Sequence, residues 1–254
     1  MDRLDNLRSG ASSLKLIYTK EHLEELLKKA ESKNQTYQEF LQAVFDEELK
    51  NKLQKAKDKR IKEAGFPVLK RLEDFDVNFQ TSINQRQLNQ LGELTWIEQL
   101  YNLILLGPPG VGKTHLGIAL GYKAAEEGYH VSFVTMSSLI HTLRTSEVTL
   151  RSKTKLNRIY KSALLIIDEV GYLPIERTDA NLFFKLISDL HEQTSIIITS
   201  NKGFEEWAEF FGDPALATAI LDRLTYRCDI IPLHGKSYRL EHRSSYLTQM
   251  QVKS

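Results

Sequence analysis

Residues 107–114 read GPPGVGKT and fit the pattern G-x-x-x-x-G-K-[ST], whose chemistry is phosphate binding. Glycines in such a loop let successive backbone N–H groups face an anion. Lys113 can reach the β- and γ-phosphates of a nucleotide, and the hydroxyl of Thr114 can hold Mg²⁺. The predicted phosphate-binding loop therefore consists of Gly107, Pro108, Pro109, Gly110, Val111, Gly112, Lys113 and Thr114.

A pair of carboxylates follows a second apolar run. In LLIIDEVG, Asp168 and Glu169 come at the carboxyl end of an expected buried strand, where α/β sheets present their ligands. Asp168 is placed to hold Mg²⁺, and Glu169 can polarise a water for attack on the γ-phosphate. A kinase does not need the second carboxylate, because its nucleophile is a substrate hydroxyl, so the pair favours hydrolysis. The alternative is a carboxylate pair that caps the next loop.

A third polar element ends another apolar run, at TSN, residues 199–201. If this strand lies between the other two, Asn201 can orient the attacking water together with Glu169. Thr199 and Ser200 are alternatives for this role. Asn201 can also simply begin a turn.

An arginine candidate lies further along the chain. Asp213 as N-cap and Pro214 at the first helical position predict a helix that ends near Arg223 and Arg227. Far in sequence from the phosphate loop, either arginine can reach the γ-phosphate of a neighbouring subunit. An ordinary helix end, with Asp222 as the ion-pair partner, is the alternative.

The elements around these residues alternate between strands and helices. Helical segments separate five short aliphatic runs, which predicts a parallel sheet covered by helices on both faces. The fold class is therefore α/β, a P-loop nucleotide-binding fold. The predicted strands are 103–106, 131–135, 164–167, 195–199 and 229–233.

The first 65 residues lack strand patterns and are predicted to be helical. Thr36 and Glu39 form a capping-box pair before a long apolar-periodic segment, and 65–67 (Gly-Phe-Pro) ends it. A further helix is expected from about 82 to 99. The predicted domains are a helical domain of residues 1–66, for DNA or partner binding, and a nucleotide-binding domain of residues 67–254.

Composition narrows the class further. The chain has 254 residues and one cysteine, which excludes a disulfide framework and a cysteine metal cluster. Apolar runs fall far short of the ~20 residues that span a bilayer, and the charged start lacks a signal-peptide core, so a cytoplasmic protein is expected. Positive charge gathers at 50–63, where Lys55 and Lys59 are candidates for DNA contact or belong to a solvated helix face.

Four motifs together resemble a known group of proteins. GPPGVGKTHLG, LLIIDEVGYLP, IIITSN and LDRL, in this order, are similar to the AAA+ ATPases of the initiator and helicase-loader group and, within it, to the IstB family. The resemblance runs from about residue 10 to about residue 245. It implies an AAA+ domain that binds ATP and Mg²⁺ after a small helical domain. Fewer residues follow the last strand than an AAA+ helical lid needs, so a truncated lid with a short C-terminal helix is expected.

The resemblance also implies a function. IstB-like proteins hydrolyse ATP at subunit interfaces, oligomerise on duplex DNA with little sequence preference, select the target and recruit and stimulate an IstA-like transposase in insertion-sequence transposition. Arg223 then corresponds to the arginine that acts on the next subunit. The alternative is a replicative helicase loader of the DnaC type; a nucleotide-gated interaction module and a small-molecule kinase are more remote.

Two further sets of residues follow from the resemblance. The group inserts an extra helix after the second strand, and residues 136–161 are long enough for two helices. Their basic side chains are the first choice for phosphate contacts with DNA, with a solvated face as the alternative: Arg151, Lys153, Lys155, Arg158 and Lys161. The second nucleotide-sensing arginine of the group corresponds to Arg239, or to Arg243.

Overall fold

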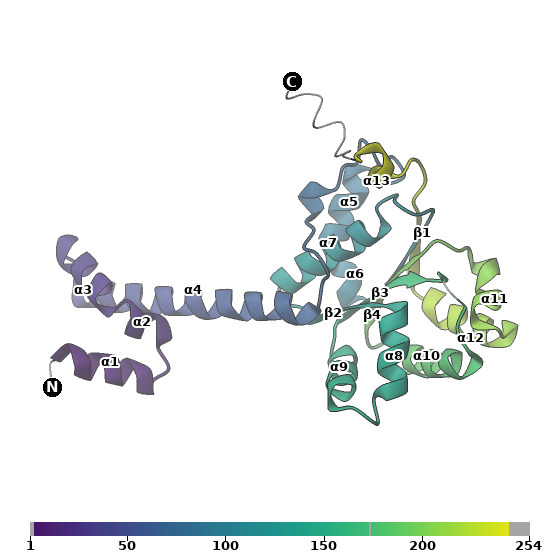
Figure 1. Cartoon of the computed structure of the whole chain (residues 1–254). Coiled ribbons are helices and arrows are strands. Elements are labelled where there is room, and N and C mark those ends of the chain that lie inside the picture. Colours follow the sequence, from purple (N-terminus) through teal and green to yellow (C-terminus); the bar gives the residue numbers. More distant parts are fainter. Residues whose placement is uncertain (1–2, 173, 244–254) are drawn as a thin grey trace, which may run out of the picture. The chain divides into compact units, whose positions relative to one another are not determined.

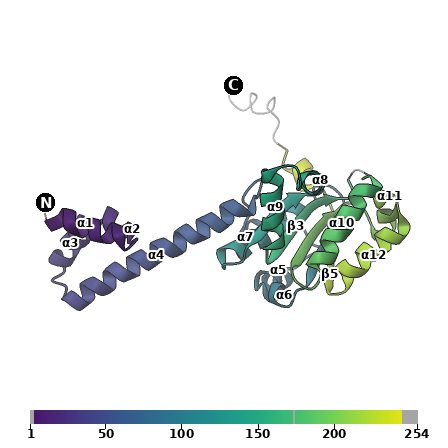
Figure 2. The same ribbon diagram turned by 90° about the horizontal axis from the view of Figure 1, so that it is seen from below.

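The computed structural model describes residues 3–172 and 174–243. Contacts divide the chain into two compact units, Met1–Lys59 and Arg60–Ser254. Both are drawn in Figure 1 and, turned by 90°, in Figure 2.

The first unit is helical, as predicted. It contains α1 (Arg3–Ser13), α2 (Ile17–Glu21), α3 (Leu23–Ser32) and most of α4 (Tyr37–Ala64). The predicted capping box is present at the start of α4: the Thr36 backbone N–H donates to Glu39 Oε2 at 2.7 Å, and the Glu39 N–H donates to Thr36 Oγ1 at 3.3 Å. The helix ends before Gly65, whose φ of 77° is in the region that glycine tolerates.

A buried carboxylate joins α2 to α4. Glu48 on α4 is only 3% exposed. Its Oε1 accepts the backbone N–H of Ile17 at 3.0 Å, and its Oε2 accepts the N–H of Thr19 at 3.0 Å. These two N–H groups lie in the first turn of α2, where no intrahelical acceptor exists. Glu48, a side chain of α4, therefore accepts hydrogen bonds from the free backbone N–H groups at the start of α2.

The apolar residues of α4 divide unequally between core and solvent. Val44 is buried at 7% exposure, whereas a row with a spacing of four residues is more than half exposed. This row consists of Tyr37, Leu41, Phe45, Leu49 and Leu53. The predicted helix is confirmed. However, only some of its regularly spaced apolar side chains are buried in the core of the helical unit.

The last turns of α4 belong to the second unit. Arg60 Nε donates to the carbonyl of Ala125 at 3.0 Å, and Ala64 is buried in the second unit's core. The division between the units thus falls inside a continuous helix, before the limit of 66 suggested by the Gly-Phe-Pro sequence.

The second unit is built on a five-stranded parallel sheet with the order β2-β3-β4-β1-β5. Each strand overlaps one of the five predicted runs. The strands are β1 (Asn102–Leu106), β2 (Val131–Thr135), β3 (Leu164–Val170), β4 (Ser195–Ser200) and β5 (Cys228–Pro232). The position of β4 between β1 and β3 is the order on which the Asn201 hypothesis depended.

Helices cover both faces of this sheet, as expected for strands with continuous apolar sequence. Alternate strand residues point to opposite faces: Ile104 packs in one core and its neighbours Leu103 and Leu105 in the other. One core contains residues of α8 (Met136–Thr145), α10 (Arg177–Leu190), α11 (Trp207–Phe211) and α12 (Pro214–Thr225). The other contains residues of α5 (Gln85–Gly92), α6 (Thr95–Glu98) and α7 (Lys113–Glu126).

The single helix predicted from about 82 to 99 is wrong, because α5 and α6 are separate. Leu94 interrupts them with a left-handed φ of 62°. The break lets Trp96 and Ile97 enter the core, and Trp96 Nε1 donates to the carbonyl of Leu91 at 2.9 Å. Burial of two large apolar residues outweighs the local helical pattern.

The two helices predicted for residues 136–161 are confirmed as α8 and α9 (Leu150–Tyr160). After β5 the described chain contains one short helix, α13 (Tyr238–Glu241), as expected. The short 3₁₀ segments are η1 (Leu72–Asp74) and η2 (Phe204–Glu206). Among the described residues, no helix combines the length and the apolar character needed to cross a bilayer.

Replacing Glu48 by glutamine tests the junction in the helical unit. Glu48→Gln puts an amide N–H₂ group where one of the two acceptors was, so a buried backbone N–H loses its partner. We expect a loss of about 2 kcal/mol in the free energy of unfolding of this unit. Urea denaturation of the full chain, followed by far-UV circular dichroism, measures it. The exposed Glu31→Gln on α3 is the matched control; equal unfolding curves for the two variants would contradict this role of Glu48.

Candidate nucleotide-binding site

The predicted phosphate loop connects β1 to the start of α7, at the carboxyl edge of the sheet. Gly112 is the N-cap of α7. The loop therefore lies before the positive end of a 14-residue helix, which favours an anion. Its central position in the sheet also places it next to the ends of β4 and β5.

Two glycines allow the chain after β5 to lie against this loop. A Cβ on Gly107 would stand 1.9 Å from the carbonyl oxygen of Leu233, and one on Gly110 would stand 2.1 Å from Ser237 Oγ. Both glycines have positive φ, 148° and 86°. The backbone N–H of Tyr238 donates to the Gly110 carbonyl at 3.0 Å. The loop thus depends on glycine for its conformation and for the approach of the C-terminal segment.

Lys113 lies folded over the phosphate loop. Its Nζ donates to the carbonyl oxygens of Gly107 and Pro108, at 2.6 and 2.8 Å, and the residue is 9% exposed. Burial lowers the pKa of Lys113; the nearby Asp168 carboxylate opposes this shift, and Arg239 adds to it. The ammonium group is therefore held beside the anion cradle.

Asp168 connects three elements of the site. The residue is 5% exposed, and its Oδ1 accepts a hydrogen bond from Thr114 Oγ1 at 2.8 Å and another from Thr199 Oγ1 at 2.5 Å. A hydroxyl and a carboxylate in contact are an oxygen donor pair of the kind that Mg²⁺ prefers. Among the described residues there is no cluster of three or more His, Cys, Asp or Glu that could hold a metal. The pair therefore suits an ion whose other ligands are phosphate and water.

Glu169 differs from its neighbours on β3 in exposure and backbone. Asp168 and Val170 are buried, whereas Glu169 is exposed. Its φ of 64° is left-handed, which is uncommon for a residue with a side chain. Its backbone N–H donates to Thr199 Oγ1 at 3.0 Å. The carboxylate of Glu169 is accessible from solvent at the edge where the phosphate loop lies.

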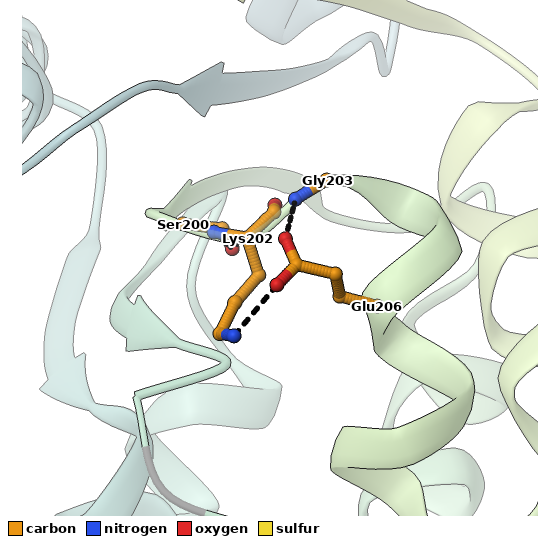
Figure 3. A network of polar contacts seen from close by, with 4 residues as sticks. All are labelled: Ser200, Lys202, Gly203 and Glu206. Atoms are coloured by element: carbon orange, nitrogen blue, oxygen red, sulfur yellow. Dashed lines mark hydrogen bonds and ion pairs between the residues drawn. The ribbon is translucent and has the colours of Figure 1, made fainter.

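Asn201, the proposed water-orienting residue, is the first residue after β4 and is exposed. The residues around it, Ser200, Lys202, Gly203 and Glu206, form a network of polar contacts (Figure 3). Ser200 Oγ accepts the Lys202 N–H and donates to the Lys202 carbonyl, each at 3.0 Å. Glu206 accepts from Lys202 Nζ at 2.6 Å and from the Gly203 N–H at 3.0 Å, and this pairing lowers the pKa of Glu206. The hydrogen bonds between Ser200 and Lys202 therefore hold the backbone on both sides of Asn201.

A cavity of about 460 Å³ continues from the phosphate loop. Its size is in the range of small-molecule sites. Of the residues that line it outside the loop, sequence reasoning named Arg239 and missed the others; for Phe75 and Phe79 the signal was the aromatic content of residues 72–79. The lining residues outside the loop include Phe75, Phe79, Gln80, His115, Tyr238 and Arg239.

Aromatic and polar groups shape this cavity. Phe75 and His115 meet edge to face with ring centroids 5.5 Å apart, and burial lowers the pKa of His115. Phe79 and Tyr238 meet edge to face at 5.1 Å. The buried Gln80 donates from Nε2 to the Val111 carbonyl at 2.8 Å and so ties the cavity wall to the phosphate loop. A flat heterocycle next to a phosphate chain fits this lining.

A larger cavity of about 650 Å³ lies elsewhere, between η1, α5 and the end of α7. None of the predicted site residues lines it. The chemistry therefore favours the smaller cavity beside Lys113 and Thr114 as the ligand site.

Comparison with known proteins identifies the family. The family model of the IstB-like ATP binding proteins matches residues 9–246. The chain belongs to this family. It is 44% identical over 232 residues to an insertion sequence IS21 putative ATP-binding protein of Pseudomonas aeruginosa, covering 91% of this chain and 88% of that one. It is 39% identical to an insertion sequence IS5376 putative ATP-binding protein of Geobacillus stearothermophilus, with 84% and 85% covered.

Solved structures with the same fold include replication proteins. A DnaI structure superposes with a TM-score of 0.53 at 22% identity, covering 67% of this chain and 90% of DnaI. An AMPPCP-bound DnaA from Aquifex aeolicus gives 0.51 at 20% identity, covering 72% of this chain and 54% of DnaA. These similarities confirm the AAA+ fold predicted from the motifs.

The two candidate arginines of this IstB-like chain lie away from its own phosphate loop. Arg223 stacks over Phe184 at 4.6 Å and donates from Nη1 to the Ala219 carbonyl at 2.9 Å. It lines a small cavity with Asn102, the first residue of β1 and so at the amino edge of the sheet. Arg227 Nη1 donates to the Gln99 carbonyl at 3.2 Å. Arg239, by contrast, lines the cavity beside Lys113.

The basic residues of α9 fall into two groups. Lys155 donates from Nζ to Ser138 Oγ at 2.7 Å, and burial lowers its pKa. Arg158 donates from Nη1 to the Glu63 carbonyl at 3.1 Å. Arg158 is nevertheless exposed, and so are Arg151 and Lys153 on α9, Lys161 directly after it, and Lys55 and Lys59 on α4. The structure thus assigns internal contacts to two of the five cations that were grouped together from the sequence.

Replacing Gly110 by alanine tests the phosphate loop. The added methyl group would meet Ser237 and require a left-handed alanine, which together cost on the order of 1–3 kcal/mol. We expect Gly110→Ala to weaken ATP binding by about tenfold or more, measured by titration with a fluorescent ATP analogue.

Gly128→Ala is the matched control, because Gly128 also has positive φ, 110°, but a Cβ there would meet no atom within 4 Å. Equal nucleotide affinity in the two alanine variants would mean that the loop geometry around Gly110 does not form the site.

Proposed function

We propose that the protein is an ATP-hydrolysing, DNA-binding helper of insertion-sequence transposition. The observation that carries this proposal is the contact between Thr114 and Asp168 beside an exposed Glu169, in a chain of the IstB-like family. The relatives that it matches are named after insertion sequences, which supports a transposase, rather than a replicative helicase, as partner.

In the proposed reaction the residues of this chain bind and orient the reactants. The loop N–H groups and Lys113 hold the phosphates, and Thr114 and Asp168 would hold Mg²⁺. When bound there, Mg²⁺ would neutralise part of the negative charge of the phosphates. Glu169 accepts a proton from the attacking water, and Asn201 orients that water.

We further propose that the site is completed by a second copy of the chain. Arg223 lies at the amino edge of the sheet, whereas Lys113 and Asp168 lie at the carboxyl edge. Arg223 can therefore stabilise charge on a γ-phosphate only in the site of a neighbouring subunit. ATP hydrolysis would in this way be coupled to assembly of the protein on DNA. The exposed cations of α9 would contact the phosphates of that DNA. Selection of the target and stimulation of the transposase belong to the same proposal.

Removing the proposed base tests the hydrolytic step. Glu169→Gln keeps the size of the side chain but cannot accept the proton. We expect kcat for ATP hydrolysis to fall by about 10²–10⁴-fold while the affinity for ATP stays within about threefold. Glu192→Gln is the control, since Glu192 is also an exposed glutamate with positive φ, 54°. ATP turnover at the wild-type rate in Glu169→Gln would exclude Glu169 as the base.

The salt dependence of DNA binding tests the second part of the proposal. Each phosphate contact contributes about 0.9 to the slope of log K against log salt concentration. We expect Arg151→Ala, Lys153→Ala and Lys161→Ala, each alone, to reduce that slope by about 1, measured by fluorescence anisotropy with duplex DNA and ATP. Lys185→Ala removes an exposed cation of α10 and is expected to leave the slope unchanged. Absence of duplex binding at low salt would contradict the DNA-binding function.

A further inference from the structure

Thr199 is a buried threonine at the end of β4 whose hydroxyl bonds to both carboxylate residues of β3. It is 1% exposed. Its Oγ1 accepts the backbone N–H of Glu169 at 3.0 Å and donates to Asp168 Oδ1 at 2.5 Å. One side chain thus contacts the backbone of the proposed base and the carboxylate proposed to hold the metal.

The strand pairing explains why a side chain is needed here. β3 and β4 pair Ile167 with Ile198, and the next pair is Val170 with Ser200. Two residues of β3, Asp168 and Glu169, therefore lie opposite the single residue Thr199, which is the arrangement of a β-bulge. The Glu169 N–H has left the regular ladder, and even a partly buried N–H without an acceptor is costly. The Thr199 hydroxyl replaces the missing acceptor.

The bulge decides where the Glu169 side chain points. In a regular strand, successive side chains alternate between the two covered faces of the sheet. Here Glu169 has a left-handed φ of 64° and its side chain is exposed, while Asp168 and Val170 are buried. A non-glycine residue keeps such a conformation only where its surroundings hold it. The hydrogen bond from its own N–H to Thr199 Oγ1, at 3.0 Å, acts on the backbone at this residue.

We propose that Thr199 is a positioning residue for ATP hydrolysis, because its hydroxyl holds the Glu169 backbone in the bulge that aims the carboxylate at the nucleotide. This inference rests on the proposed ATPase function. Thr199 itself touches neither water nor phosphate in this role. Its bond to Asp168 fixes the hydroxyl, so that its lone pairs face Glu169.

Hydrogen exchange of the Glu169 amide tests the bond directly. In the wild-type chain without nucleotide, this N–H is expected to exchange slowly, measured by NMR on ¹⁵N-labelled protein, although the residue is exposed. Thr199→Val keeps the shape of the side chain and removes the hydroxyl. We expect the Glu169 amide to exchange about tenfold faster in this variant, as for the loss of one hydrogen bond, and Thr199→Ser to restore slow exchange.

Steady-state kinetics test the consequence. A displaced general base lowers the rate of the chemical step rather than substrate binding, so Thr199→Val is expected to reduce kcat by about 10–100-fold with ATP affinity within about threefold of wild type. Thr194→Val is the matched control. Thr194 precedes β4 at its other end, is 5% exposed, and donates to the Ser162 carbonyl at 3.1 Å, so the variant loses a similar buried bond away from the site.

Several results would overturn the inference. A rapidly exchanging Glu169 amide in the wild-type protein would do so without any variant, and so would unchanged exchange or unchanged kcat in Thr199→Val. An equal loss of kcat in Thr194→Val would make the effect one of general stability. Absence of ATP turnover in the wild type would instead refute the proposed function, and the role of Thr199 with it; slow exchange at Glu169 would then show that the bond exists without that role.

Discussion

The carboxylate of Asp168 is the point on which the nucleotide site depends. Its Oδ1 accepts hydroxyl hydrogen bonds from Thr114 at the start of α7 and from Thr199 at the end of β4. These elements come from distant parts of the chain and meet because β4 lies between β1 and β3 in a parallel sheet. All carboxyl ends of a parallel sheet lie at one edge, so one buried carboxylate can connect them.

The other features of the site follow from satisfying buried polar groups at this edge. Lys113 finds acceptors in the carbonyls of Gly107 and Pro108, and the turn after β4 closes on Glu206. The segment after β5 packs against Gly110, and Tyr238 and Arg239 line the cavity that continues from the loop. The described segment after β5 therefore supplies one wall of the candidate nucleotide cavity.

Much of the fold could be predicted because its signals are local. Each of the five apolar runs became a strand, the Thr36–Glu39 capping box begins α4, and residues 136–161 form two helices. The predictions failed where packing overrides local pattern. Leu94 breaks the helix expected through residue 99, because Trp96 and Ile97 enter the core. Leu41 and Phe45 follow the spacing of a buried helix face, but both side chains are exposed.

The sequence by itself determined the family, and it predicted the phosphate loop and the carboxylate pair, because glycine spacing and adjacent strand-ending acids have few other uses. Only the tertiary structure decided which polar residue of the TSN segment meets Asp168. That residue is Thr199, because a bulge in β3 places both Asp168 and Glu169 opposite it. It also decided that Arg223 lies at the opposite edge from Lys113, and that Lys155 and Arg158 have partners of their own. Spacing along the chain records neither strand register nor the partners of a side chain, because both arise only when distant segments pack together.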